Sequence, residues 1–218
     1  MSDQLAAFIL GLVQGLTEFL PVSSTAHLIL VSDALKLDPE KFGLTFDVAL
    51  HLGTALAVLL YFAGTWVGLL VDVIRGRWRV PLAIVVGTIP AAIAGVLFES
   101  TISTTVRSTA YIAVGLLIGS AIFVLAERAD ATRFAFLLAT PIILGAGLKT
   151  LLDARKLAGL TAQLDVVAIG FVVSFVSGFA AVAFLVRYLR THSLRIFVIY
   201  RVVLAIVILV ALALGALH

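Results

Sequence analysis

The feature that most constrains this chain is a succession of long apolar runs separated by short polar links. The last run, from Leu194 to Leu217, holds only two charged residues, Arg195 at its start and Arg201 within it. About 20 apolar residues suffice for a helix to cross a bilayer. Of the 218 residues, 62% are hydrophobic and 12% are charged, whereas about 25% are charged in soluble domains. The sequence therefore predicts an all-α integral membrane protein.

The runs and links predict one membrane domain over residues 1–218. Residues 1–35 are expected to form a re-entrant helical hairpin, residues 44–126 the first three spans and residues 134–217 the last three. The connector 32–41 and the turn 72–80 lie outside the membrane. The six predicted transmembrane helices are Leu44–Trp66, Pro81–Phe98, Thr109–Ala126, Phe134–Leu152, Val166–Tyr188 and Leu194–Leu217.

A faint internal repeat joins the two halves. FDVALHLGT from Phe46 and FAFLLATPI from Phe134 open the first and fourth predicted spans. Three spans separate them, so the two segments run in opposite directions. This is the inverted-repeat architecture of many transport-type folds.

Basic residues indicate the orientation. Lysines and arginines are in slight excess on the side that carries Arg75, Arg77 and Arg79, and the positive-inside rule places that side in the cytoplasm. The N-terminal hairpin then opens to the outside. The sequence pI of about 9.5 comes from these basic residues in the links. We therefore interpret it as a sign of membrane orientation and expect no nucleic-acid partner. A homodimer is compatible with the composition.

The chemically densest stretch is GLVQGLTEFLPVSSTAHLIL, from Gly11 to Leu30. Read as a helix, it places Gln14 and Glu18 on one face, one turn apart. Pro21 ends that helix, and the hydroxyl residues that follow are good N-caps for a second short helix. Each half has about ten apolar residues, too few for a full crossing. A hairpin that dips into the membrane and returns is expected.

Glu18 carries the strongest functional signal, because an acid inside a membrane is costly unless it faces a cavity or a partner. The alternative is a position near the interface on a monotopic helix. Backbone N–H groups and the hydroxyls of Ser23, Ser24 and Thr25 at a helix start form an anion site, and a nearby acid can hold Mg²⁺ or Ca²⁺. The alternative for this break is a simple helix stop and cap. His27 adds a group able to act as acid, base or nucleophile.

Three residues beyond the hairpin are also candidates. Asp47 and His51 lie four apart in the first span and either line the same cavity or make buried structural hydrogen bonds. Arg201 lies inside the sixth span, where it needs a counter-charge or a phosphate. The sequence leaves structural pairing and anion binding open for Arg201.

QGLTEFLPVSSTAHL resembles the first signature of the bacterial undecaprenyl-pyrophosphate phosphatase family, of the bacitracin-resistance type. The similarity continues at FDVALHLGTALAVLLYF, GTIPAAIAGVLFE, FAFLLATPIILGAG and LRIFVIYR. It implies hydrolysis of undecaprenyl pyrophosphate to the monophosphate that carries cell-wall precursors, with a divalent cation, at the bacterial cytoplasmic membrane. It assigns Gln14, Glu18 and His27 to catalytic and metal-associated positions, and Ser23 to Thr25 to the phosphate-facing loop.

The chain departs from that family at its second signature, Pro-Gly-x-Ser-Arg-Ser-Gly-x-Thr, which the family carries on a second hairpin between the third and fourth spans. Here the interval is Glu127 to Arg133, and the chain contains no Ser-Arg-Ser. The second hairpin is therefore predicted to be missing. This leaves a non-hydrolytic polyprenyl-phosphate binder or translocator as an alternative to a phosphatase. A purely structural membrane subunit is a third reading, but it leaves Glu18 and His27 unexplained.

Overall fold

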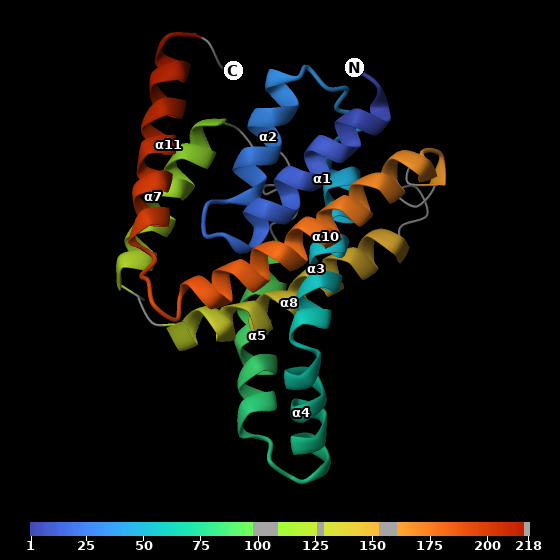
Figure 1. Ribbon diagram of the computed structural model, residues 1–218, viewed down its shortest axis with the longest axis vertical. Helices are drawn as coiled ribbons and strands as arrows, with labels where there is room; N and C mark the ends of the chain where they lie inside the picture. The colour runs from blue at the N-terminus through green and yellow to red at the C-terminus, as the bar shows by residue number, and fades with distance from the viewer. Residues whose placement is uncertain (98–108, 126–128, 153–160, 216–218) are drawn as a thin grey trace.

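The computed structural model describes residues 1–97, 109–125, 129–152 and 161–215. Within these ranges the chain is helical and has no strand (Figure 1). The helices of the described residues are α1 (Asp3–Phe19), α2 (Ser24–Ala34), α3 (Leu44–Tyr61), α4 (Ala63–Ile74), α5 (Arg79–Leu97), α7 (Thr109–Leu125), α8 (Ala129–Leu152), α10 (Leu164–Tyr188) and α11 (Arg195–Ala213).

The N-terminal stretch folds as helix, break and helix, as the sequence predicted. The Oγ of Ser2 caps α1 by accepting a hydrogen bond from the N–H of Leu5 at 3.3 Å. The first helix ends at Phe19, ahead of Pro21, and the second begins at Ser24. At the break Ser23 takes a φ of 75°, in the left-handed region. It occupies the N-cap position but makes no side-chain capping bond, so the expected use of its hydroxyl as a cap is wrong.

The first predicted span, Leu44–Trp66, is interrupted. Helix α3 ends at Tyr61, and Phe62 separates it from α4. The ring of Phe62 is buried, with its centroid 6.2 Å from that of Phe136 on α8. This contact lies where α3 ends, and nothing in the sequence around Phe62 predicted the interruption.

The predicted turn 72–80 is shorter than expected. Helix α4 continues to Ile74 and α5 begins at Arg79. At the tip, the guanidinium of Arg77 pairs with the carboxylate of Asp72 at 2.5 Å. The α4 and α5 helices project away from the other helices as an antiparallel pair (Figure 1).

Other predicted boundaries agree to within a few residues, except at the start of α8. That helix begins at Ala129, so the part of the predicted link 127–133 that the structure describes is helical. The predicted ends at Phe98, Ala126 and Leu217 lie outside the described residues.

Among the described residues, three helices are long and apolar enough to cross a membrane: α3, α10 and α11. Shorter apolar helical stretches occupy Ala63–Ile74, Arg79–Pro90 and Phe136–Lys149. Helix α1 also exposes one apolar face, formed by Leu5, Phe8, Leu12 and Leu16. An exposed face of this kind is suited to lipid contact and not to water. These features describe an all-helical protein of membrane type.

Small residues allow α1, α3 and α10 to pack closely and so position the candidate site. A Cβ at Gly15 of α1 would meet the hydroxyl of Ser177 and the backbone of α10. A Cβ at Gly53 of α3 would meet Ser174 and the backbone of α10 in the same way. The Ser174 hydroxyl also donates to the carbonyl of Leu50 on α3 at 2.9 Å. With both helices held against α10, the end of α1 lies beside the middle of α3 (Figure 1).

Candidate functional site

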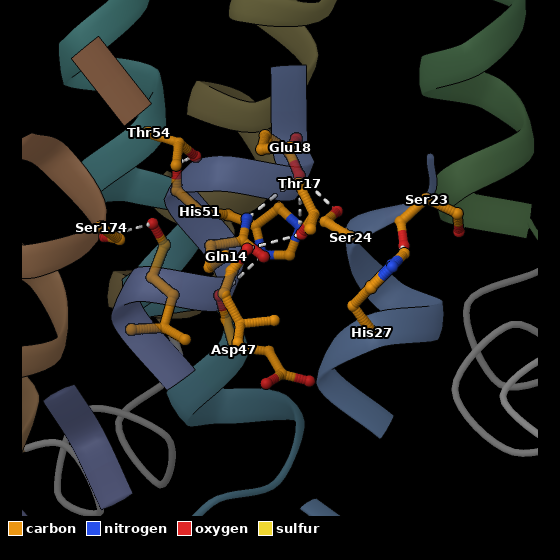
Figure 2. Close-up of polar contacts among 12 residues, drawn as sticks. Gln14, Thr17, Glu18, Ser23, Ser24, His27, Asp47, His51, Thr54 and Ser174 are labelled. Atoms are coloured by element: carbon orange, nitrogen blue, oxygen red, sulfur yellow. Dashed lines mark hydrogen bonds and ion pairs between the residues drawn. The ribbon is translucent and has the colours of Figure 1, made fainter. Parts of the chain in front are cut away.

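The candidate site is centred on the carboxylate of Glu18, in the last turn of α1. Its Oε2 accepts a hydrogen bond from Gln14 Nε2 at 3.0 Å and one from Ser24 Oγ at 2.5 Å. The Nε2 of His51 lies 3.5 Å from the same oxygen. Figure 2 shows these side chains converging from α1, α2 and α3. Glu18 therefore has polar partners inside the helical packing. Without such partners, a carboxylate in an apolar environment has a high free-energy cost.

Gln14 lies one turn before Glu18, so the prediction that they share a face is confirmed. The Gln14 side chain is completely buried. Its Nε2 is satisfied by Glu18, but its Oε1 is buried without a hydrogen-bond partner. A buried amide oxygen normally has a partner, so this atom is available to a bound group.

His51 joins the site from α3. Its Nδ1 lies 2.7 Å from the backbone carbonyl oxygen of Asp47. A carbonyl can only accept, so this contact places a proton on Nδ1 and directs Nε2 toward Glu18. Of the roles that the sequence left open for His51, the structure shows the hydrogen bond, which is partly buried, and it places the ring beside Glu18. The Asp47 side chain is buried and points away from the His51 ring (Figure 2).

His27 faces a different set of partners. Its Nδ1 lies 2.7 Å from the carbonyl oxygen of Ser23, and its Nε2 lies 2.6 Å from the hydroxyl of Tyr200 on α11. The two rings are stacked with centroids 5.7 Å apart. In Figure 2 His27 lies on the far side of Ser24 from His51. The hairpin thus carries two polar clusters, one at Glu18 and one at His27, on either side of the start of α2.

Tyr200 is a site residue that sequence reasoning missed. Its only signal was a hydroxyl within an apolar run, next to Arg201. That signal could not reveal its partner, because His27 is far away along the chain.

Arg201 is buried and donates to backbone carbonyls. Its Nε and Nη2 donate to Leu116 and Gly115 of α7 at 3.2 and 3.1 Å, and its Nη1 donates to Pro21 at 3.5 Å. The guanidinium therefore ties α11 to α7 and to the break in the hairpin. These contacts give Arg201 a structural role, and phosphate binding by Arg201 stays a prediction. Thr25 of the predicted phosphate-facing loop is exposed.

The donors around Glu18 suit a hard divalent cation. A carboxylate, an unpartnered amide oxygen and a hydroxyl are oxygen ligands of the kind that Mg²⁺ and Ca²⁺ prefer. The described residues contain no group of three or more His, Cys, Asp or Glu side chains arranged around a metal position. A cation here would need further ligands, which Mg²⁺ commonly takes from substrate phosphates and water.

Comparison with known proteins gives one family. The family model described as "Bacitracin resistance protein BacA" matches residues 7–131 and 126–207. Undecaprenyl-diphosphatase of Desulforudis audaxviator is 38% identical over 254 aligned positions, covering 93% of this chain and 95% of the relative. Undecaprenyl-diphosphatase of Rubrobacter xylanophilus is 34% identical, with 94% and 97% covered. That of Geotalea daltonii is 35% identical over 271 positions, with 98% and 100% covered.

These alignments also show a difference in length. They extend over 254 and 271 positions, more than the 218 residues of this chain, so the relatives carry residues that this chain lacks. The family match divides into two parts that overlap at residues 126–131. This is the interval in which the sequence lacks the second signature.

Proposed function

The chain belongs to the bacitracin resistance protein BacA family, and from this membership we propose that it is an undecaprenyl-diphosphatase. It hydrolyses undecaprenyl pyrophosphate to undecaprenyl phosphate and inorganic phosphate, which recycles the cell-wall lipid carrier. Relatives of this name align over nearly their full length with nearly the whole of this chain. The observation that carries the proposal is the Glu18 carboxylate, held by Gln14, Ser24 and His51 at the hairpin break.

In this proposal Glu18 and Gln14 hold the divalent cation. A cation bound there would supply positive charge that neutralises the phosphate oxygens during phosphoryl transfer. Ser24 orients Glu18 through its short hydrogen bond. The backbone N–H groups of Ser23 to Thr25, at the start of α2, bind phosphate oxygens.

His27 supplies the acid–base group of the proposed reaction. Hydrolysis consumes one water, whose hydroxyl joins the released phosphate while a proton passes to the leaving undecaprenyl phosphate. His27 is held in place on both ring nitrogens, by Ser23 and by Tyr200. Such fixation reduces the entropy lost in reaching the transition state.

The proposed topology has six spans and one re-entrant hairpin, α1 with α2. The lengths of 17 and 11 residues correspond to about 26 and 17 Å at 1.5 Å per residue, less than the roughly 30 Å of a hydrocarbon core. The arginines at the α4–α5 tip face the cytoplasm under the positive-inside rule. The active site then faces the outside of the bacterial cytoplasmic membrane.

The proposal is tested by phosphate release from undecaprenyl pyrophosphate, using protein purified in detergent. Mg²⁺ or Ca²⁺ is added in one arm and a chelator in the other, and the lipid product is identified by mass spectrometry. We expect cation-dependent release of phosphate together with undecaprenyl phosphate. If folded protein released neither product in any arm, the proposed activity would be contradicted.

A second candidate function is a polyprenyl-pyrophosphate binder or translocator that hydrolyses its ligand slowly. It is favoured by the divided family match and by the missing second signature. That signature would supply an arginine and further N–H donors, and losing one well-placed donor slows catalysis about 10²–10³-fold. Insertion of a hairpin carrying Pro-Gly-x-Ser-Arg-Ser-Gly-x-Thr after Arg128 should then raise turnover by about that factor. Equal turnover would show that the second hairpin is dispensable.

A further inference from the structure

We propose that the tip of the α4–α5 pair binds anionic phospholipid headgroups at the membrane surface, with Arg75 and Arg79 as the residues that contact the headgroups. The tip comprises residues 74–80, from the last residue of α4 into the first turn of α5. It lies at the far end of the projecting pair, away from α1 and α2 (Figure 1). This surface is remote from the proposed active site, so its role can be tested without measuring hydrolysis.

The charge of the tip is the first argument. Its three arginines, Arg75, Arg77 and Arg79, are all exposed. Arg77 is already paired, because its Nε and Nη2 lie 2.8 and 2.5 Å from Asp72 Oδ1. Among the residues that the structure describes, neither Arg75 nor Arg79 forms an ion pair. These two arginines are therefore open to an anion from outside the chain.

The backbone of the tip adds to this positive charge. The N–H groups of residues 75–77 donate hydrogen bonds to the last carbonyl groups of α4. The first helical bond of α5 runs from the Leu82 N–H to the Trp78 carbonyl, so the N–H groups of Arg79 and Val80 have no partner within that helix. These N–H groups carry the partial positive charge of a helix start. The negative end of α4 is thus satisfied inside the turn, whereas the positive end of α5 is open.

The apolar side chains beside the arginines indicate a lipid partner and not a soluble acidic protein. Ile74 and Trp78 are 83% and 55% exposed. Val80 and Leu82 in the first turn of α5 are exposed as well. Tryptophan is enriched at the membrane interface, where its ring lies at headgroup level, and arginine keeps its stem on apolar surface while its charged end reaches polar groups. Lipid would cover these apolar side chains and also supply the anion.

The proposed topology places the tip at the membrane face where anionic lipid is available. Under the positive-inside rule the arginine-rich tip faces the cytoplasm. Anionic lipids make the surface of that leaflet negative, and each lysine or arginine near it strengthens the attraction by about fivefold. Arg75 and Arg79 should therefore enrich anionic lipid around the tip.

The test measures which lipid contacts Trp78. The chain has two tryptophans, so Trp66→Phe leaves Trp78 as the only one. The full chain is reconstituted in vesicles of phosphatidylcholine and phosphatidylglycerol, in which one lipid or the other is brominated, because bromine quenches the fluorescence of an indole that it contacts. We expect phosphatidylglycerol to bind beside Trp78 at least about fivefold more strongly than phosphatidylcholine. Added salt should reduce this preference.

Substitutions assign the preference to particular residues. Arg75→Gln combined with Arg79→Gln should bring the binding ratio of the two lipids close to one. The matched control combines Arg187→Gln with Arg190→Gln, which removes two exposed arginines at the end of α10, a region well apart from the tip in Figure 1. The control should keep the preference.

Three results would overturn the inference, whether or not the chain releases phosphate. The first is equal quenching by the two lipids when both arginines are present. The second is no quenching by either lipid, which would place the tip outside the bilayer. The third is a preference for phosphatidylglycerol that survives the loss of Arg75 and Arg79.

A second measurement keeps both tryptophans. Native mass spectrometry of the chain in detergent counts the phosphatidylglycerol and phosphatidylcholine molecules that remain bound. We expect more phosphatidylglycerol on the unaltered chain and on the α10 control than on the variant without Arg75 and Arg79. Equal retention by all three proteins, or retention of added inorganic phosphate without phosphatidylglycerol, would contradict a lipid-binding tip.

Discussion

The hydroxyl of Ser24 donates a 2.5 Å hydrogen bond to Glu18 Oε2 across the break at Pro21. This bond joins the last turn of α1 to the first residue of α2. It places a carboxylate beside the backbone N–H groups that begin α2, where an anion and its cation can be held together. The relationship explains why the acidic residue and the hydroxyl residues occur in one short stretch.

Ser24→Ala should lower kcat for phosphate release by about tenfold or more, since the partly buried Glu18 carboxylate would lose a charge-assisted hydrogen bond and its fixed position. Ser24→Thr, which keeps a hydroxyl, should restore part of the rate. Thr88→Ala is the matched control, because the Thr88 hydroxyl on α5 is exposed and donates to the Val85 carbonyl of its own helix. Equal kcat values for Ser24→Ala and the control would show that Ser24 does not orient Glu18.

Tyr200→Phe tests the second polar cluster. The substitution keeps the stacking of this ring on His27 but removes the hydroxyl that lies 2.6 Å from its Nε2. We expect kcat to fall by about tenfold with KM changed less, because general acid–base catalysis contributes about 10²–10⁴-fold and positioning is part of it. If His27→Gln lowers kcat and Tyr200→Phe does not, then Tyr200 has no positioning role.

Gly15→Ala should destabilise the protein. The new methyl group would meet backbone atoms of Ser174 and Gly178 as well as the Ser177 hydroxyl, and overpacking of this kind costs about 1–3 kcal/mol. Gly68→Ala is the control, because a Cβ at Gly68 on α4 meets nothing within 4 Å. Thermal unfolding in detergent should show a lower midpoint for Gly15→Ala alone. An unchanged midpoint would contradict the close packing of α1 on α10.

The membrane topology can be tested by single cysteines, because the chain contains none of its own. A membrane-impermeant thiol reagent applied to intact cells should label Asp38→Cys. It should label Arg77→Cys only after the cells are permeabilised. Both positions are exposed in links between helices. Labelling of the two from the same side would exclude six spans with a re-entrant hairpin.

Local features of the fold could be predicted from the sequence. Pro21 and the hydroxyl residues after it predicted the break between α1 and α2, because their effects on the backbone act within a few residues. The i to i+4 spacing likewise predicted the contact of Gln14 with Glu18. These are properties of a helix and do not depend on its neighbours.

Contacts between distant helices could not be predicted in the same way. The pairing of His27 with Tyr200, and the approach of His51 to Glu18, depend on how α11 and α3 pack against the hairpin. Helix α3 ends at Tyr61, next to Phe62, whose ring packs beside Phe136 of α8. An apolar run carries no signal for any of these, since every position in it is equally suited to lipid and to helix packing.

The most direct test of the account is phosphate release from undecaprenyl pyrophosphate by Glu18→Gln beside Glu40→Gln. Both substitutions remove one carboxylate charge, but Glu40 is exposed in the connector after α2. We expect Glu40→Gln to keep the unaltered rate and Glu18→Gln to lose cation-dependent release down to the rate without protein, while both unfold at the same temperature. Cation-dependent release by folded Glu18→Gln at the rate of Glu40→Gln would contradict the claim that the reaction is centred on Glu18.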